Sequence, residues 1–569
     1  MDALRRAQWL DRQLVDPCDL REELSHARRF EDEARGHPRG ELRTWLQAEL
    51  HRHYVPRAFG GEFRSFEDAA ALMRMVARRD LSVAVTHAIT LLGTAVVLLA
   101  GDTSQQRALA GSVLAGEPVS VALTEQASGS DLLAMTTAAR PSGDGYRLKG
   151  EKWLADGLDR HRFVVVYART ADRGGPRGFS HFLVDKHAIP AGVRAFGKLS
   201  TPGVRGADFR GVHFDAQLPR TALIGVEGSG FEVILKVLQV ARTICGALSL
   251  GALDTALDMV LRFALQCKVD GKRVAELPQS QKLLVAAWAE LLVCDSVTGL
   301  ALRSLHAVPS QASVHSAVVR HLVPTLAEQA MQKLSVVYGA RYSLRHGDDP
   351  RVFQKMYRDN QVMGLFDGST QVSLFNLSQQ LRSLIIHMRA AEVPGWAHNA
   401  SEPTELDWTM LSLSARGRDA VLAGFDAGCY ALRAAMQQHA CETRQSIEIS
   451  LVRLQQARVE LSDAILRLSP GAFAAGDPAA FELARHYCVV AAAAAVLADW
   501  QVNRAALVST LADPAVLAVV LYRLTAQLGE LPLPTACYRD CFTALLARRE
   551  RYGRCGLYAM PTEETSPLS

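Results

Sequence analysis

The spacing of apolar residues predicts helices in the first part of the chain. Phe66–Val76 and Ser104–Leu114 carry apolar side chains at helical spacing. Asp102, just before the second of these segments, is a typical helix-capping residue. Tyr54–Gly61 interrupts the pattern with Pro and Gly and predicts a loop. We therefore expect a helical domain over residues 1–115.

The period of the apolar pattern changes between residues 116 and 222. Short apolar runs separated by Gly-, Pro- and Asp-rich clusters such as Ser142–Gly145 are typical of strands and turns. The expected strands are Val119–Leu123, Tyr146–Leu148, Phe163–Tyr167, His181–Val184 and Gly211–Phe214. Short strands with frequent turns predict a small antiparallel barrel or sandwich over residues 116–222.

Helical spacing returns after residue 222 and continues almost to the end of the chain. Phe231–Ala241 and Gly246–Leu265 are long amphipathic stretches that predict a helix bundle over residues 223–394. Val393–Trp396 contains Pro and Gly and predicts a linker. Residues 395–569 then predict a further helical domain. The fold class is mainly α with a central β domain, and four domains suit a chain of 569 residues.

Composition and charge indicate which classes of binding partner the protein is expected to lack. The net charge of +4 is small for this length and favours neither nucleic acid nor an anionic membrane surface. The N-terminal sequence lacks the apolar core of a secretory signal. The longest apolar run identified from the pattern, Tyr487–Trp500, is shorter than the roughly 20 residues of a membrane span and predicts a buried helix. We expect a cytoplasmic protein without a membrane span.

The ten cysteines form no CxxC pair and show no metal-like spacing with histidine. They are typical of reduced thiols in a protein core. Cys537 and Cys541 lie one helical turn apart, a spacing that suits either metal ligands or a buried helix face. The buried face is favoured, because a motif match needs a structural context before it indicates a site. We expect no metal.

Six motifs, in one order, carry a resemblance to a known family. The longest reads ALTEQASGSD, and another reads GEKWL. The motifs are Val55–Gly61, Ala122–Asp131, Gly150–Leu154, Gly203–Gly206, Gly225–Phe231 and Arg358–Ser369. Their sequences and order resemble the acyl-CoA dehydrogenase family over roughly residues 40 to 385. Six ordered motifs are much stronger evidence than a single glycine-rich loop.

The resemblance implies an FAD enzyme that removes an α-proton from an acyl thioester and passes the β-hydrogen as hydride to the flavin. It places Leu123 and Thr124 at the pyrimidine edge of the flavin, and Trp153 against the isoalloxazine. It places Gly129 and Ser130 at the pyrophosphate, with Ser130 also at the substrate. Glycine suits a close approach to a ligand because it has no Cβ.

The same resemblance assigns residues further along the chain. Ala155 would lie beside flavin N5, and Ser369 and Gln371 near the adenosine half of FAD. Arg242 matches a basic position near the acyl pocket, and Asp367 matches the catalytic base. Taken singly, Trp153, Arg242 and Asp367 would be ordinary core, surface and turn residues, so their assignment depends on the motif context.

Three departures from the family pattern concern the chemistry. Asp367 stands where the family usually has Glu, and Ala241 occupies the family's second location for the base. Asp is one methylene shorter than Glu, which matters because a base must come within about 2.6–3.2 Å of its proton. Ala155 stands where the family commonly has Thr or Ser, whose hydroxyl reaches flavin N5.

Other departures concern assembly. Cys267–Gly271 lacks the Arg and Phe of the corresponding family segment, and Gln332 is followed by Ser335 and Val336 instead of a glycine pair. In tetrameric members these positions help neighbouring subunits hold each other's FAD. The extension after residue 395 resembles, in placement, that of the very-long-chain members, which are dimers. We therefore expect a homodimer.

Three functions stay open at this stage. The first is an FAD-dependent dehydrogenase of an acyl group carried by CoA or a carrier protein, in specialised metabolism. The second is a flavin-dependent decarboxylase, dehydrogenase and monooxygenase that acts on a β-keto acid and forms an epoxyketone or a similar group. The Asp367 and Ala155 departures favour this second function, because decarboxylation makes a carbanion without proton abstraction. The third is a non-catalytic binding or assembly protein.

Overall fold

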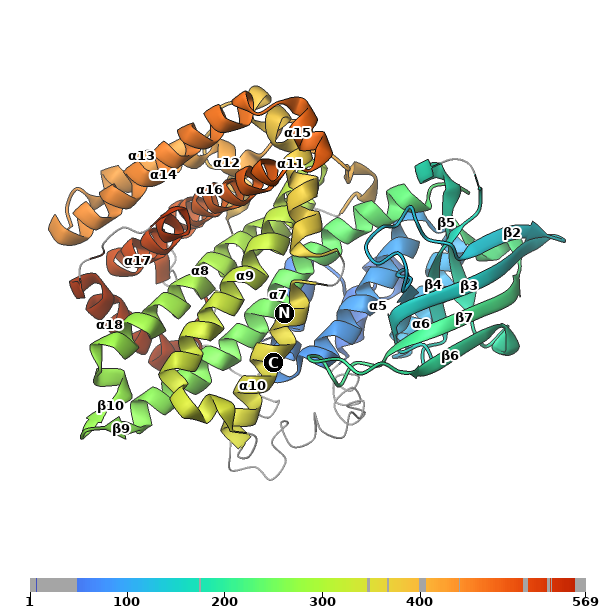
Figure 1. Cartoon of the computed structure of the whole chain (residues 1–569), viewed down its shortest axis with the longest axis horizontal. Helices are drawn as coiled ribbons and strands as arrows, with labels where there is room; N and C mark the ends of the chain where they lie inside the picture. The colour runs from blue at the N-terminus through green and yellow to red at the C-terminus, as the bar shows by residue number, and fades with distance from the viewer. Residues whose placement is uncertain are drawn as a thin grey trace.

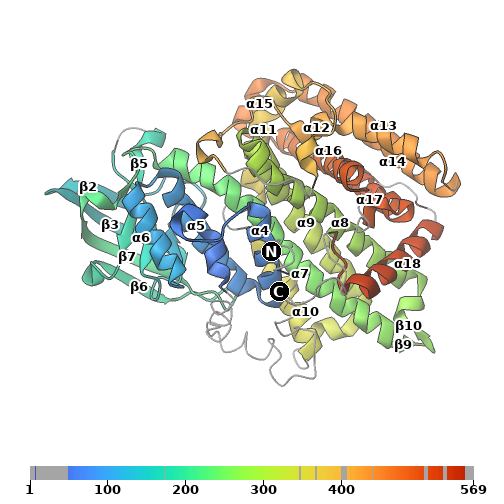
Figure 2. The ribbon, with the colours of Figure 1, turned by 180° about the vertical axis from the view of Figure 1, so that it is seen from behind.

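The molecule consists of a β-sheet at one end and a large body of helices at the other (Figure 1). The computed structural model describes Ala7 and residues 49–172, 175–344, 348–365, 368–398, 406–439, 441–504, 510–529, 533 and 535–557. Helices α4, α5 and α6 lie between the sheet and the longer helices of the body (Figure 2). The mainly helical fold with a central sheet confirms the predicted fold class.

In the described part of the chain, three α-helices precede the sheet: α4 (Phe66–Arg79), α5 (Leu81–Ala100) and α6 (Thr103–Leu114). Asp80 separates the first two and caps α5, because its carboxylate accepts hydrogen bonds from the backbone N–H groups of Ser82 and Val83. Asp102 and Gln105 form a capping box at the start of α6, as the sequence predicts. Capping thus explains both helix starts.

Eight strands form one connected sheet in the order β6-β7-β3-β2-β4-β5-β8, with β1 paired to β4. The strands are β1 (Val119–Ala122), β2 (Ala138–Ser142), β3 (Gly145–Asp156), β4 (Phe163–Arg169), β5 (Phe179–Asp185), β6 (Val193–Lys198), β7 (Phe209–Leu218) and β8 (Leu223–Ile224). The five predicted strands are all present. Two pairings with β4, by β1 and by β2, are parallel, so the sheet is mixed where the sequence predicted it antiparallel.

Helix α7 (Gly230–Gln266) is the centre of the helical body. It packs on α4, α5, α8 (Pro278–Ala307), α9 (Ala312–Tyr338) and α10 (Asp348–Met363). Helix α11 (Thr370–His387) packs along α9, and β9 (Lys268–Val269) and β10 (Lys272–Arg273) form a hairpin after α7. Gly230 starts α7 against the sheet, where a Cβ atom would lie 2.7 Å from the Cα of Ser180. Only glycine permits this approach of helix to strand.

The chain after α11 adds seven helices to the described structure. They are α12 (Ala420–Ala423), α13 (Phe425–Met436), α14 (Cys441–Arg467), α15 (Pro470–Ala475), α16 (Pro478–Asn503), α17 (Pro514–Thr525) and α18 (Thr535–Tyr552). Three of them, α16, α17 and α18, pack on α8. One apolar core runs through the bundle and these helices. The predicted domain limits at residues 115, 222 and 394 therefore stay a prediction.

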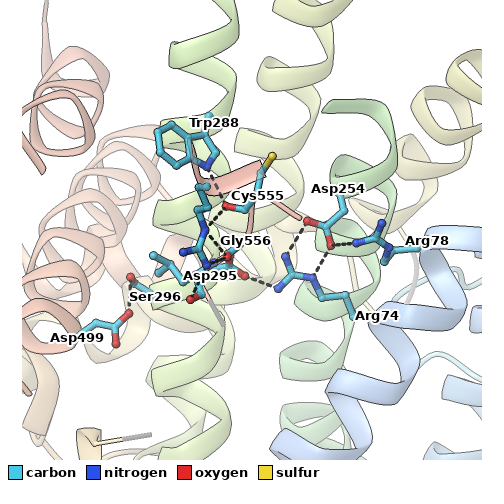
Figure 3. Close-up of polar contacts among 11 residues, drawn as sticks. Arg74, Arg78, Asp254, Trp288, Asp295, Ser296, Asp499, Cys555 and Gly556 are labelled. Carbon is cyan, nitrogen blue, oxygen red and sulfur yellow. Dashed lines mark hydrogen bonds and ion pairs between the residues drawn. The ribbon is translucent and has the colours of Figure 1, made fainter. Parts of the chain in front are cut away.

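A buried ionic network joins α4 to the bundle (Figure 3). The guanidinium group of Arg74 donates hydrogen bonds to both carboxylate oxygens of Asp254 on α7, at 2.7 and 2.9 Å. It also donates to Asp295 on α8, whose side chain is 1% exposed. Because a buried charge needs a partner, these three side chains hold α4, α7 and α8 together.

The same network holds the segment after α18. The backbone N–H of Leu557 donates to Asp295 at 2.8 Å, and the indole N–H of Trp288 donates to the carbonyl of Cys555 at 2.9 Å. Arg548 on α18 donates to the carbonyl groups of three consecutive residues, Cys555 to Leu557. The C-terminal helices are therefore tied to the bundle through polar groups as well as through the apolar core.

Four helices in the described part of the chain are long and apolar enough to span a membrane by length and composition: α5, α7, α8 and α16. Their most apolar windows are 72 to 89% buried inside the fold. The expectation that no apolar segment has the length of a membrane span is therefore wrong, because α5 has 20 residues. The predicted absence of a membrane span stays a prediction. Tyr487–Trp500 lies within α16 and is almost entirely buried, as expected.

Cys537 and Cys541 lie on α18 with side chains 2% and 1% exposed. Both are free thiols in the structure. No group of three or more potential metal-ligating side chains was found among the described residues. The prediction of a buried helix face at these two positions is confirmed.

We expect the substitution Asp295→Ala to lower the free energy of unfolding by ~3–5 kcal/mol, because it leaves the buried Arg74 without one of its carboxylate partners. Urea unfolding followed by circular dichroism measures this change. Glu460→Ala, which removes a half-exposed partner of Arg453 on α14, is the control and should cost much less. Equal losses in the two variants would contradict the role of the network.

Candidate active site

A buried ion pair lies beneath the long motif at the end of β1. The ammonium group of Lys152 on β3 is 2.9 Å from a carboxylate oxygen of Glu125, and the two side chains are 0% and 6% exposed. Glu125 also accepts hydrogen bonds from the backbone N–H groups of Thr136 and Thr137 and from the Thr136 hydroxyl. Glu125 thus joins both ends of the loop between β1 and β2.

Residues of β3 also fix the backbone of the motif. Lys152 donates a second hydrogen bond, of 2.9 Å, to the carbonyl oxygen of Leu123. The next residue, Trp153, donates its backbone N–H to the carbonyl of Thr124 at 2.8 Å. Two consecutive residues of one strand therefore hold two consecutive peptide groups of the motif.

The pKa values of the pair are consistent with both side chains being charged. Burial raises the pKa of Glu125, but the Lys152 cation and the hydrogen bonds from Thr136 and Thr137 outweigh it and lower this pKa to about 2. Burial lowers the pKa of Lys152 to about 8, although Glu125 opposes this shift. At neutral pH the pair is therefore an ammonium and a carboxylate.

The loop beyond Glu125 turns sharply and is exposed. The backbone N–H groups of Ser128 and Gly129 both donate to the carbonyl of Glu125. Gly129 has a φ of +54°, and no atom lies within 4 Å of the place where a Cβ would be. Ser130 is exposed beside it. The backbone at Gly129 and Ser130 is thus open to the approach of a ligand.

Trp153 and Leu154 form a partly exposed apolar surface next to this loop. The pairing of β3 with β7 shifts register between Lys152 and Ala155, and Leu154 has a φ of +56° within this bulge. Strained backbone of this kind costs ~1–3 kcal/mol and is concentrated at functional sites. Leu154 is 38% exposed and Trp153 is half-buried, whereas Ala155 is 2% exposed. The methyl group of Ala155 thus lies in the core of the sheet.

Two buried arginines converge on the turn before α11. Gly368 has a φ of +84°, and a Cβ at this residue would lie 2.7 Å from Nη2 of Arg242 on α7. The carbonyl oxygen of Gly368 accepts a hydrogen bond from Nε of Arg320 on α9, at 3.1 Å. Arg242 is 6% exposed and Arg320 is fully buried. Two guanidinium groups therefore lie against the backbone of this turn.

The predicted residues around this turn are only partly brought together. Ser369 caps α11 through a hydrogen bond from the backbone N–H of Val372, and Gln371 is exposed on the first turn of α11. Gln332 is exposed on α9, 12 residues beyond Arg320, which is about 18 Å at 1.5 Å per residue. Gln332 thus lies apart from the turn at Gly368 within one chain. Phe366 and Asp367 lie outside the described residues.

The Arg-Asp motif before this turn joins the helical body to the sheet. Asp359 accepts a hydrogen bond of 2.6 Å from the backbone N–H of Val204, in the loop between β6 and β7. Lys355 on α10 lies between Asp359, at 2.5 Å, and Asp80, at 3.3 Å. Burial raises the pKa of Asp80, and Lys355 opposes this shift. One cation therefore links α10, the cap of α5 and the sheet.

Sequence reasoning missed three residues of this arrangement: Lys152, Arg320 and Lys355. Lys152 was visible as a charged residue of the motif Gly150–Leu154, just after the predicted strand Tyr146–Leu148. Lys355 and Asp359 are spaced i, i+4, a helical ion-pair spacing that was also visible. Arg320 gave no such signal, because the contact that defines it comes from a turn 48 residues later.

Solved structures with the same architecture identify the class of protein. The fold is similar to that of butyryl-CoA dehydrogenase from Megasphaera elsdenii, with a TM-score of 0.60 and 19% identity, covering 66% of this chain and 95% of that one. It is also similar to a structure described as PigA with FAD and proline, with a TM-score of 0.59 and 19% identity, covering 65% and 94%. At this identity the likeness shows the fold alone.

The family follows from the sequence models that match the chain. The N-terminal, middle and C-terminal domains of acyl-CoA dehydrogenase match residues 20–117, 120–217 and 228–381. The chain therefore belongs to the acyl-CoA dehydrogenase family, and it is an oxidoreductase of the dehydrogenase type with FAD as its cofactor. Among its relatives is the probable acyl-CoA dehydrogenase fadE25 of Mycobacterium leprae, 26% identical over 58% of this chain and 83% of that protein.

We expect the stability of the protein to fall as the pH decreases from 4.5 to 2, in part because of Glu125. Its pKa is lower in the folded protein than in the unfolded chain, so its stabilising contribution is present above pH 4.5 and is lost as the pH falls towards 2. Glu125→Gln should flatten this dependence in urea unfolding measured at several pH values. Glu151→Gln, at an exposed position of β3 next to Lys152, is the control and should follow the wild type.

We expect Gly368→Ala to lower the free energy of unfolding by ~1–2 kcal/mol or more, because φ at this residue is left-handed and the new Cβ would displace Arg242. Gly364→Ala is a matched control four residues earlier, where a Cβ would meet its nearest atom at an ordinary 3.7 Å. Thermal unfolding of both variants makes the comparison. A Gly368→Ala variant as stable as Gly364→Ala would contradict the close contact with Arg242.

Proposed function

We propose that the protein desaturates an acyl group, carried by CoA or a carrier protein, at its α,β bond. The observation that carries this proposal is the pair of buried arginines at Gly368. Asp367 directly precedes this glycine in the sequence. Positive charge close to a carboxyl group favours its ionised form, which is the form that a general base requires. Asp367 would take the α-proton of the acyl group.

The residues around the exposed loop suit FAD. Leu123 and Thr124 are half-buried, and their carbonyl groups are held by Lys152 and Trp153, so their backbone cannot turn away from a ligand. The half-buried indole of Trp153 offers a flat apolar surface of the kind that packs against an isoalloxazine. The open backbone at Gly129 and Ser130 suits a pyrophosphate. When bound, FAD accepts the β-hydrogen of the substrate as hydride.

The same proposal covers the binding of the adenosine end of FAD and the oligomeric state of the protein. Ser369 caps α11 and Gln371 lies on its accessible first turn, while Gln332 lies about 18 Å along α9 from Arg320, which contacts the turn before α11. A Gln332 side chain would then reach FAD of a second subunit rather than its own, which supports a homodimer. We also propose a cytoplasmic location and a role in specialised metabolism, because the base and the residue at Ala155 depart from the family pattern.

A second function is favoured by the position of Ala155. Its methyl group is 2% exposed in the core of the sheet and offers no hydroxyl group for flavin N5. Loss of that hydrogen bond would change how the reduced flavin meets oxygen. Together with the shorter Asp367, this supports a decarboxylase and monooxygenase that acts on a β-keto acid and forms an epoxyketone. A non-catalytic protein on the same fold is the remaining alternative.

The experiment that separates these functions is an anaerobic titration of the FAD-loaded protein, followed by exposure to air. Bleaching of the flavin absorbance by acyl-CoA supports the dehydrogenase. Flavin that stays oxidised with acyl-CoA, together with oxygen consumption in the presence of a β-keto acid, supports the monooxygenase. A protein that does not take up FAD would contradict both functions and leave the non-catalytic one.

For the dehydrogenase, we expect Asp367→Asn to slow the bleaching of the flavin by ~100-fold or more, because general-base catalysis contributes roughly this much. FAD content should be unchanged, as measured by absorbance after gel filtration. Asp144→Asn, in an exposed turn between β2 and β3, is the control and should bleach at the wild-type rate. A fast Asp367→Asn variant would show that another group takes the proton.

A further inference from the structure

The linker between α11 and α12 lies against the elements that carry the candidate site. Its described part before α12 includes residues 406–415, which lie beyond the last family match at residue 381. The side-chain amide of Gln239 on α7 donates a hydrogen bond of 2.8 Å to the carbonyl of Ser412. The backbone N–H of Ala415 donates to the side chain of Gln380 on α11, also at 2.8 Å. The linker is thus attached to both α7 and α11.

One of these attachments lies near the turn at Gly368, where Arg242 and Arg320 converge. Gln239 is 4% exposed and lies three residues before Arg242, so the two side chains project from neighbouring turns on one side of α7. The other attachment, at Gln380, lies ten residues beyond the start of α11, which is about 15 Å at 1.5 Å per residue. The linker is therefore attached to α7 close to Arg242 and to α11 further from the turn.

Trp408 is the large side chain that the linker turns inward. It lies edge-on to Phe66, the first residue of α4, with ring centroids 5.8 Å apart and an angle of 89° between the rings. Phe66 is fully buried and its backbone N–H is bonded to His306 at the end of α8. Trp408 is therefore supported from behind by rigid elements of the bundle.

Trp408 also reaches the apolar cluster on which the candidate site is built. It is partly buried against the core of the bundle and against a second cluster that contains Leu92 of α5 and Val237 of α7. Leu123, at the flavin motif, and Ala241, next to Arg242, pack against this same second cluster. An acyl chain bound beside Leu123 and Ala241 would need apolar walls, and the partly buried side chains around this cluster, Trp408 among them, would provide them.

We propose that Trp408 forms the end wall of the acyl-binding site and limits the length of the acyl chain that the enzyme accepts. The proposal rests on the dehydrogenase function proposed above. It assigns substrate selection to a residue of the linker, outside the matched family domains. The indole is held between Phe66 and the second cluster, so it cannot move aside without opening both contacts.

The effect of removing this wall follows from the burial of methylene groups. Each additional CH₂ group that becomes buried favours binding about fourfold. A chain too long for the wild-type site should gain this factor for every methylene that occupies the space of the indole. A chain that already fits should gain nothing and should lose some affinity, because the enlarged site is no longer filled.

The test compares Trp408→Ala with the wild type over a series of straight-chain saturated acyl-CoAs of increasing length. Each FAD-loaded protein is mixed anaerobically with each acyl-CoA, and the rate of flavin bleaching is measured against concentration. We expect the optimum to move to longer chains, with about a fourfold rise in kcat/KM for each methylene group beyond the wild-type limit. Trp408→Phe should lie between the two, because the smaller ring fills part of the same space.

Trp396→Ala is the matched control. Trp396 is the other half-buried tryptophan of the linker, and it packs against the core of the bundle. Its removal should leave the chain-length optimum unchanged. Thermal unfolding and FAD content of each variant show whether it is folded, and Trp408→Phe carries the test if Trp408→Ala is not.

The outcomes separate this inference from the proposed function. A wild-type flavin that no acyl-CoA bleaches would overturn the dehydrogenase function and the role of Trp408 with it. A wild-type enzyme with a clear optimum that both Trp408 variants share would overturn the role of Trp408 alone. A shift of the optimum in the Trp408 variants, but not in Trp396→Ala, would support it.

Discussion

Charged side chains buried inside a protein must meet partners, and this constraint determines how the parts of the molecule are joined. Lys152 and Glu125 satisfy it within the sheet, where the pair also holds the carbonyl of Leu123. Lys355 satisfies it between α10 and the cap of α5. Removing one member of such a set leaves the other charge unpaired, which costs far more than the complete set contributes. Each junction therefore depends on all of its charged partners being in place.

Helix α7 brings the consequences of these junctions together. Its start packs against β5 at Gly230, its middle carries Arg242, and Asp254 lies further along in the network with Arg74. A displacement of the sheet, of the turn before α11 or of α4 would thus alter contacts of this one helix. This explains how two surfaces far apart in the sequence, that of Trp153 and Leu154 and the turn at Gly368, are held at fixed positions relative to each other.

The C-terminal helices are part of this arrangement rather than an addition to it. They share the apolar core of the bundle, and their last segment meets Asp295 and Trp288 in the buried network. The linker that leads to them is hydrogen-bonded to α7 three residues before Arg242 and to α11 at Gln380. A chain of this family can therefore acquire a new wall for its substrate site without any change in the helices that carry the chemistry.

The sequence by itself determined the family, the order of helices and strands, and most of the candidate residues. These features depend on local signals: apolar spacing, the Asp102 cap, and motifs such as Ala122–Asp131 in which neighbouring residues act together. The mixed pairing of the sheet, the partner of Lys152 and the approach of Arg320 to Gly368 were decided only by the tertiary structure. Each of these depends on contacts between residues far apart in the chain, which a periodicity or a motif does not record.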